Sequence, residues 1–364
     1  MELTVGVEEE FLLTDATTRR TVWRSAEVLR STAQRVGDGI VPEMAEAQVE
    51  TVSRVCADLS ELRAELLVLR REAARAAETA GCRLVASGTV VLGSPGPPPV
   101  LDQPRYHRIV ERFGPVVDQQ CVCSCHVHVG IADREEAVQV VNHLRPWLPA
   151  LLAISGNSPY WEGRDTGYHS WRTQLWGRWP MAGPPPRLTG AHEYREVVAD
   201  LVDSGAILDD AMLYWYARPS HHQPTVEVRV ADVPQTVDDT VLIAALVKAL
   251  ATTALADVRA GRAAPHVADQ VLRAACWRAS RYGLPEDAAA PPAGDRSWTA
   301  TGLSALVNHI SPALDAAGET GFALNALRER RAGGSGSLRQ RLAHRRRGRL
   351  EDVVDMLAER AVAG

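Results

Sequence analysis

The chain has 364 residues, of which 46% are hydrophobic and 23% charged. This ordinary globular composition excludes a mainly disordered, a collagen-like and a small disulfide-stapled protein. A formal net charge of −5 provides no broad positive field for binding nucleic acid or an acidic membrane. Lys248 is the single lysine among 40 basic residues, which excludes a Gly-Lys-Ser/Thr phosphate loop and leaves no spare lysine for a Schiff base.

Hydrophobic periodicity and breaker residues predict the order of elements along the chain. Strands are expected over residues 3–13, 83–92, 121–131 and 224–233. Helices are expected over residues 58–80, 104–119, 133–153, 238–260, 266–282, 298–316, 321–332 and 338–362. The first helix should begin at a capping box of Asp58 and Glu61 and stop at Gly81, while Pro146 and Pro149 should bend the third.

Strands separated by helices in irregular order predict an α+β fold with a mostly antiparallel sheet. We expect one domain over residues 1–364, helical from about residue 238, with a loop at 284–296 and a hinge at 332–337. The N-terminus lacks the features of a secretory signal, and no apolar run approaches the 18 residues of a membrane span. These features predict a cytoplasmic protein without disulfides among its six cysteines.

Residues 155–191 form a long, irregular stretch that is rich in glycine and proline. Five of the nine tryptophans lie in or beside it: Trp147, Trp161, Trp171, Trp176 and Trp179. Long loops inside compact domains are usually functional or disordered, and the aromatic residues argue against disorder. We therefore expect an ordered substrate loop, with a packed surface loop as the alternative.

The segment GVEEEF places two glutamates on one face of the first strand. Side chains alternate along a strand, so Glu8 and Glu10 share a face, while Val5, Val7 and Glu9 share the other. Two bare carboxylates at about 4 Å repel each other by about 4 kcal/mol at an effective dielectric constant near 20. A magnesium ion, which takes oxygen ligands, would remove this repulsion. Solvated glutamates on an exposed strand face are the alternative.

The strand at 121–131 repeats this pattern with histidines. His126 and His128 share a face with Ser124, which predicts a metal or phosphate site. The opposite face carries Cys121, Cys123 and Cys125 with two valines. This period-two pattern favours small buried hydrophobic side chains over a thiolate metal site.

A third strand places Glu227 and Arg229 on one face, opposite Val226, Val228 and Val230. A surface ion pair is the alternative interpretation of Glu227 and Arg229. Arg218 lies just upstream, and the segment VPEMAEAQVET adds Glu43 and Glu50. Acidic groups together with arginines suit a metal–nucleotide site, because metals and arginines both offset phosphate charge.

The whole chain resembles the carboxylate-amine ligase family, also called glutamate–cysteine ligase type 2. The segments that carry the resemblance are GVEEEFLL, AQVET, ASGT, CHVHVGIADREEAV, SGNSPYWEGRDTGY, RWPMAGPPP and RPSHHQPTVEVRVADV. This family is similar to glutamine synthetase, so the resemblance implies a curved antiparallel catalytic sheet flanked by helices. It also implies ATP and Mg²⁺ as cofactors.

The resemblance implies a role for each matching residue. Glu8, His126 and Glu227 would hold one magnesium ion, and Glu10, Glu43 and Glu50 a second. His128 and Arg229 would face the nucleotide phosphates or the transferred phosphoryl group as catalytic residues, with Arg218 as a further phosphate contact. Arg172, Trp171 and Tyr216 would contact the substrate.

The implied reaction joins a small-molecule carboxylate and an amine through an acyl phosphate, with glutamate and cysteine as default substrates. Two departures from the family pattern concern substrate identity: Val90 and Val91 replace a usual His-Pro pair, and Tyr216 replaces a usual acidic residue. A zinc-dependent amide hydrolase using His126 and His128, and a non-catalytic nucleotide-binding relative, are the alternatives. We expect no nucleic-acid or membrane partner, and a homodimer from base rates alone.

Overall fold

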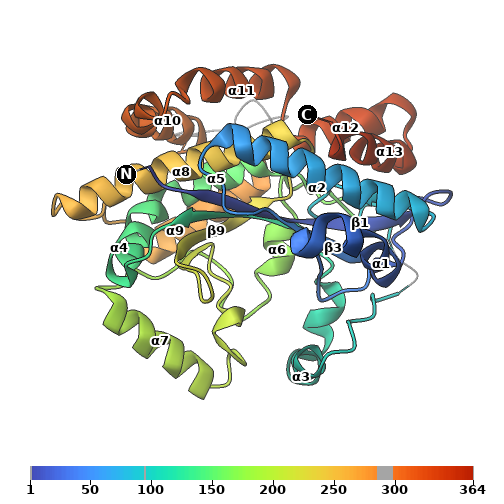
Figure 1. Ribbon diagram of the computed structural model, residues 1–364, viewed down its shortest axis with the longest axis horizontal. Coiled ribbons are helices and arrows are strands. Elements are labelled where there is room, and N and C mark those ends of the chain that lie inside the picture. The colour runs from blue at the N-terminus through green and yellow to red at the C-terminus, as the bar shows by residue number, and fades with distance from the viewer. Residues whose placement is uncertain (1, 94–95, 285–297, 364) are drawn as a thin grey trace.

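A seven-stranded sheet lies at the centre of the protein (Figure 1), in a computed structural model that describes residues 2–93, 96–284 and 298–363. The strand order is β2-β3-β1-β5-β9-β8, and β4 also pairs with β1. All these pairings are antiparallel. The strands are β1 (Val5–Asp15), β2 (Ile40–Pro42), β3 (Gln48–Val52), β4 (Cys82–Val85), β5 (Ser124–Gly130), β8 (Ala217–Pro219) and β9 (Thr225–Asp232). A separate hairpin joins β6 (Tyr160–Trp161) and β7 (Arg164–Asp165). The predicted α+β class with an antiparallel sheet is confirmed.

The long strand β1 organises this sheet, because three strands pair with it. β3 pairs with residues 8–12 along one edge, while β5 pairs with residues 5–9 and β4 with residues 12–15 along the other. The two faces of β1 differ in polarity. Val5 and Val7 are buried on one face, and Glu8 and Glu10 point from the other.

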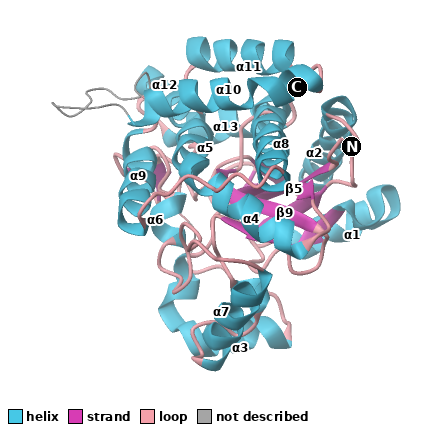
Figure 2. Cartoon of the chain, turned by 90° about the vertical axis from the view of Figure 1, so that its left-hand side faces the viewer, coloured by secondary structure: helices cyan, strands magenta, loops and turns pink. Residues whose placement is uncertain are grey.

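Helices cover the apolar face of the sheet (Figures 1 and 2). Helices α2, α5 and α8 pack on its strands, and α10 and α11 form an outer layer against α8. Helices α3 and α7 lie on the other side of the sheet. The helices are α1 (Ser25–Val36), α2 (Leu59–Thr79), α3 (Pro104–Phe113), α4 (Arg134–Leu144), α5 (Leu148–Ser155), α6 (Arg172–Trp176), α7 (Ala191–Asp203), α8 (Val237–Arg259), α9 (Asp269–Tyr282), α10 (Trp298–Ala316), α11 (Thr320–Gly333), α12 (Gly336–Arg347) and α13 (Leu350–Ala361).

One buried ion pair interrupts the apolar layer directly behind the two outward-facing glutamates of β1. The Nη2 atom of Arg70, on α2, lies 2.6 Å from Oε1 of Glu9, and neither side chain is exposed. Thr240 of α8 also donates to Glu9, at 2.6 Å. Arg70 further donates to the backbone carbonyls of residues 234, 235 and 361. This network fixes β1 against α2, α8 and the end of α13.

The predicted elements are found with several changes of extent. The strand expected over 83–92 ends at Val85, and the backbone of Val90 and Val91 accepts hydrogen bonds from the β6–β7 turn. The helix expected over 338–362 is two helices, because Gly348 adopts a left-handed conformation with φ of +67°. Elements missed from the sequence are α1, α6, α7, β2, β3, β6, β7 and β8. Most of the expected loop at 284–296 lies outside the described residues.

The expected bend in the helix over 133–153 is found, and a break between α11 and α12 falls within the segment 332–337 where a hinge is predicted. A short 3₁₀ segment, Arg145–Trp147, separates α4 from α5, and a proline is the second residue of each of the two segments after α4. Ser335 caps the start of α12 through its hydroxyl. Asp58 caps α2 as predicted, with its carboxylate accepting from the N–H groups of Ser60 and Glu61.

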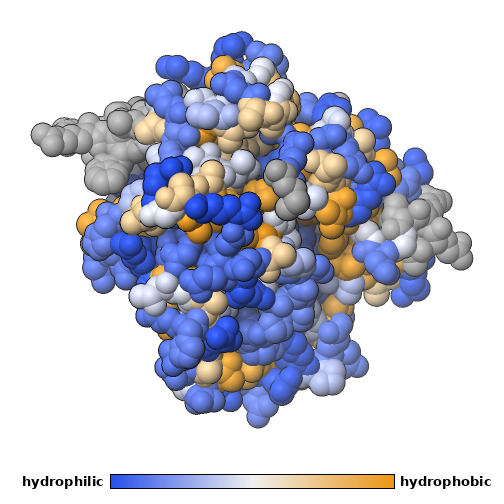
Figure 3. All heavy atoms as spheres, turned by 60° about the vertical axis from the view of Figure 1, so that its left-hand side comes forward, coloured by the Kyte–Doolittle hydropathy of each residue, from blue (hydrophilic) through white to orange (hydrophobic). Residues whose placement is uncertain are grey.

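Helix α8 is long and apolar enough to cross a membrane by composition, contrary to the expectation that no such segment occurs. However, 72% of its most apolar window is buried inside the protein. Lys248 lies on this helix, is buried and pairs with Glu319 at 2.9 Å. These contacts identify α8 as a core helix. On the molecular face in Figure 3, hydrophilic side chains cover most of the surface and apolar ones lie between them in smaller groups.

Candidate functional site

The antiparallel register places the predicted site residues directly opposite one another on the polar face of the sheet. Glu8 pairs with His126 across β1 and β5, and Glu10 pairs with Glu50 across β1 and β3. His128 pairs with Glu227 across β5 and β9. Opposed residues on antiparallel strands have Cβ atoms about 4.5–5.5 Å apart. Residues separated by more than 200 positions in the chain therefore form one cluster.

Glu8 lies at the centre of the first part of this cluster. Its Oε2 atom is 3.0 Å from Nδ1 of His126, and its Oε1 atom is 3.3 Å from Nε2 of His128. The Nδ1 atom of His126 is also 3.9 Å from Oε1 of Glu227. Burial favours the neutral form of Glu8, but the adjacent imidazoles outweigh it and hold its pKa well below the usual value.

Three carboxylates form the second part of the cluster. Ligand atoms of Glu10, Glu43 and Glu50 all lie within 4.8 Å of one another. Burial and the neighbouring charge of Glu10 raise the pKa of Glu43 to about 7. Burial and the charges of Glu8 and Glu43 raise the pKa of Glu50 well above its usual value. Without a cation, the cluster therefore opposes full ionisation of its own carboxylates.

Two arginines lie beside Glu227 and partly neutralise the cluster. Arg229 contacts Oε1 of Glu227, and Nε of Arg218 donates to Oε2 at 2.8 Å. Although burial opposes ionisation, these two guanidinium groups keep the pKa of Glu227 far below its usual value. In the part of the chain that the structure describes, five carboxylates (Glu8, Glu10, Glu43, Glu50 and Glu227) share these two arginines, so negative charge is in excess when the carboxylates are ionised.

The donor set fits divalent cations that prefer oxygen ligands. Two further groups besides Glu10, Glu43 and Glu50 have ligand atoms within 4.8 Å of one another: Glu8, Glu50 and His126, and Glu8, His128 and Glu227. Carboxylate oxygens dominate all three groups, which favours magnesium or manganese over zinc. In addition, Nε of Arg229 is buried without a hydrogen-bond partner in the described part of the chain. An unsatisfied buried donor beside this acidic cluster indicates that a ligand completes the site.

The three groups of neighbouring ligand atoms differ in one respect from the ligand sets that the sequence predicts. Glu10, Glu43 and Glu50 come together as expected. Glu8 and Glu227 share a group with His128, whereas His126 shares one with Glu8 and Glu50. The geometry therefore makes His128 a candidate ligand as well as a candidate phosphate contact.

Two predicted ligand-binding arginines already have protein partners. Arg218 donates through Nη1 to the carbonyls of residues 210, 211 and 213 in addition to its bond with Glu227. Arg172 is buried, and its Nε donates to Asp232 at 2.9 Å while Nη2 donates to the carbonyls of Arg229 and Ala231. These bonds favour positioning roles for both arginines. Their direct contact with phosphate or substrate stays a prediction.

Asp232 anchors the aromatic loop to β9. Besides Arg172, its carboxylate accepts hydrogen bonds from the hydroxyls of Ser158 and Ser170 and from the N–H of Asn157. All these residues are buried. The loop between residues 155 and 191 is thus ordered, as predicted, and is tied to the strand that carries Glu227 and Arg229.

The remaining predicted substrate contacts lie in different surroundings. Trp171 is half-buried, and its indole N–H has no partner in the described residues. Tyr216 is 7% exposed and packs in the main apolar cluster. Val90 and Val91, which depart from the family pattern, are each 3% exposed and pack in an apolar cluster with Trp161. These two valines therefore fill space beneath the loop.

Two hydroxyl groups contact the histidines of the site, and neither was predicted from the sequence as a site residue. Oγ of Ser124 lies 2.8 Å from Nε2 of His126, and Oγ1 of Thr225 lies 2.9 Å from Nδ1 of His128. The strand pattern could have identified Ser124, because it shares a strand face with His126. No sequence pattern indicates Thr225, because its contact with His128 depends on the register of β5 and β9.

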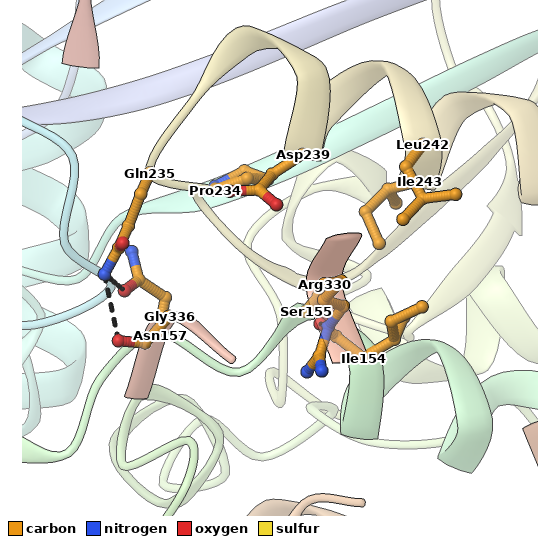
Figure 4. Close-up of a pocket in the computed structure, with 10 residues that line it drawn as sticks. All are labelled: Ile154, Ser155, Asn157, Pro234, Gln235, Asp239, Leu242, Ile243, Arg330 and Gly336. Atoms are coloured by element: carbon orange, nitrogen blue, oxygen red, sulfur yellow. Dashed lines mark hydrogen bonds between the residues drawn. The ribbon is translucent and has the colours of Figure 1, made fainter. Parts of the chain in front are cut away.

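A small cavity elsewhere in the fold is separate from this cluster (Figure 4). Its lining comes from α5, the start of α8, α11 and the segments around Asn157, Gln235 and Gly336. Inside it, Nε2 of Gln235 donates to the side-chain oxygen of Asn157 and to the carbonyl of Gly336, each at 2.9 Å. None of the predicted site residues lines this cavity, so the carboxylate–histidine cluster is the better candidate site.

Comparison with known sequences gives one family over nearly the whole chain. A family model described as glutamate-cysteine ligase family 2 matches residues 4–356. A Saccharopolyspora erythraea protein named "Putative glutamate--cysteine ligase 2-1" is 48% identical over 357 residues, which cover 98% of this chain and 94% of that protein. A protein of Mycobacterium sp. (strain KMS), named "Putative glutamate--cysteine ligase 2-2", is 46% identical over 367 residues and covers 99% of both chains.

Solved structures share the fold at much lower identity. Glutamate–cysteine ligase from Francisella tularensis, in complex with AMP, matches with a TM-score of 0.71 and 12% identity over 100% of this chain and 90% of that one. A bifunctional glutathione synthetase from Pasteurella multocida matches with a TM-score of 0.71 and 13% identity, over 99% of this chain and 52% of that one. These similarities show that the chain shares the fold of these two ligases, which agrees with the predicted antiparallel sheet flanked by helices.

Proposed function

This chain belongs to glutamate–cysteine ligase family 2 and is an ATP-dependent ligase, and from that premise we propose that it forms an amide or γ-glutamyl bond through an acyl phosphate. One observation carries the proposal: five carboxylates, two histidines and Arg229 meet on one sheet face, from four strands and, for Glu43, the segment after β2. Excess negative charge suits cations, and the adjacent arginine suits the phosphates that those cations accompany.

The site residues divide into cation ligands and phosphate contacts. Glu8, His126 and Glu227 would hold one Mg²⁺, with His128 as a further candidate. Glu10, Glu43 and Glu50 would hold a second. Bound there, the ions would neutralise polyphosphate charge. Arg229 would donate to the transferred phosphoryl group, and its unpartnered Nε supports this role.

The reaction needs no covalent enzyme nucleophile. A carboxylate oxygen of the acid attacks the γ-phosphorus of ATP, which forms an acyl phosphate and releases ADP. The amine then attacks the acyl carbon, inorganic phosphate leaves, and the amine loses a proton to give the amide. All six cysteines are buried, and desolvation raises the pKa of Cys121 and of Cys276 to about 12. Thiols in this state are poor nucleophiles.

Glutamate and cysteine are the default substrates that the family implies. The buried Asp232 network supports a substrate role for the aromatic loop, because it anchors the loop to the strand of Arg229. The oxygen-rich ligand set gives no support to a zinc hydrolase. A cytoplasmic location and a homodimer stay predictions.

The test is ADP release in a matrix of carboxylic acids and amines with Mg²⁺. The proposal predicts release that requires one particular acid and amine together. If the acid carries ¹⁸O in its carboxylate, one labelled oxygen should appear in inorganic phosphate. Glu10→Gln should abolish release, while Glu46→Gln, on the same segment as Glu43 but outside the ligand groups, should retain it. Amide formation without ¹⁸O transfer would refute the acyl phosphate.

A further inference from the structure

Ser124 contacts one residue from each of the two proposed cation sites. Its backbone N–H donates to Oε2 of Glu10 at 2.7 Å, and its hydroxyl oxygen lies 2.8 Å from Nε2 of His126. Ser124 is the first residue of β5, and it is 5% exposed. We propose that Ser124 is a positioning residue that orients His126 toward the first cation site and holds Glu10 in the second. The inference rests on the proposed function.

The hydroxyl determines which nitrogen of His126 faces Glu8 and Glu227, while the other nitrogen, Nε2, lies 3.8 Å from Oε1 of Glu10. With Nε2 bonded to Ser124, Nδ1 is the atom 3.0 Å from Glu8 and 3.9 Å from Glu227. His128 has the opposite arrangement: Thr225 contacts Nδ1, and Nε2 faces Glu8. The two hydroxyls thus select different ring nitrogens of neighbouring histidines. A hydrogen bond to the second nitrogen commonly fixes the orientation of a metal-binding histidine.

The local backbone leaves His126 without a regular partner on one side. The pairing of β5 with β9 is irregular between Cys125 and Val127, whereas His126 keeps its partner Glu8 on β1. Irregular pairing changes the direction of a side chain, and the serine hydroxyl adds a constraint on the ring. It also lies two residues before His126 on the same strand, so both side chains point to the site face.

The experiment compares Mn²⁺ binding to the wild-type enzyme and to Ser124→Ala by electron paramagnetic resonance. The alanine variant loses the hydroxyl but keeps the backbone N–H that holds Glu10. We expect two Mn²⁺ sites in the wild type. In Ser124→Ala, one site should weaken by roughly 10- to 100-fold, the usual effect of losing such a partner, while the other site stays unchanged. Ser124→Thr, which keeps a hydroxyl, should restore the weakened site.

Ser155→Ala is the matched control, because this buried serine also makes a 2.8 Å hydrogen bond, to the carbonyl of Leu151, but lies outside the ligand groups. It should leave both sites intact. If Ser124→Ala does not fold, Ser124→Cys keeps the volume and weakens the hydrogen bond, and it should show the same one-site loss. Two intact sites in these variants would overturn the role of Ser124 but leave the proposed function standing. No Mn²⁺ binding to the wild type would overturn the proposed function as well.

Discussion

Replacing Arg70 by methionine should destabilise the protein strongly, because it leaves the Glu9 carboxylate buried without its cation. Both side chains are fully buried, and Arg70 donates at 2.9 and 2.6 Å to the two oxygens of Glu9. Removing one partner of such a pair costs about 3–5 kcal/mol. An unfolding entropy of about 2.1 cal/mol/K per residue converts this loss into a Tm decrease of roughly 4–7 °C for a chain of this length.

Chemical denaturation and a double-mutant cycle measure this effect. Arg63→Met is the control, since Arg63 lies on the same helix but makes a half-exposed ion pair with Asp238, and its loss should cost less than about 1 kcal/mol. The double variant Glu9→Leu, Arg70→Met should recover part of the stability, because it leaves no buried charge, although the carbonyls of residues 234, 235 and 361 still lose their donor. Equal losses in Arg70→Met and Arg63→Met, or no recovery in the double variant, would show that the buried charge pair does not stabilise the fold.

Three further predictions concern the site itself. Glu8→Gln and His126→Ala should each lower turnover by more than tenfold in the ADP-release assay, and near-normal rates would remove them as ligands. Arg229→Met should lose turnover but retain Mn²⁺ binding, because it removes a positive charge from an acidic cluster. Loss of Mn²⁺ binding without loss of turnover would contradict the role of Arg229 as a phosphate contact. Mg²⁺ should raise the Tm more at pH 8 than at pH 5.5. The pKa of Glu43 is about 7 in the folded protein, above its usual value of 4.5, so the metal-free protein loses stability as the pH rises through 7. A bound cation would offset this loss at pH 8. Equal Tm shifts at the two pH values in calorimetry would contradict the charge assignment.

Strand alternation alone was enough to predict which residues share a face. It placed Glu8 with Glu10 and His126 with Ser124, and it assigned the cysteines to the apolar side, where they are buried. It could not supply the register, which depends on long-range pairing. The opposition of His128 to Glu227, and of Glu10 to Glu50, therefore became visible only in the structure.

The arginines show a second limit of sequence reasoning. Arg172 and Arg229 both look available for an anionic ligand in the sequence. In the structure, Arg172 donates to Asp232, 60 positions away, and to two backbone carbonyls, whereas Nε of Arg229 has no partner among the described residues. Whether an arginine is available to a ligand depends on its tertiary partners, which no local pattern encodes. Helices α1 and α7 were also missed, because neither begins at a side-chain cap of the kind that marks the start of α2 and α4.

The proposed function requires this sheet face to bind cations together with a nucleoside triphosphate. Crystals grown with Mn²⁺ and a non-hydrolysable ATP analogue, measured at the manganese absorption edge, would locate both. We expect two anomalous peaks, one beside Glu8 and Glu227 and one among Glu10, Glu43 and Glu50, with the γ-phosphate near Arg229. Nucleotide bound elsewhere, or no manganese peak on this face, would contradict it.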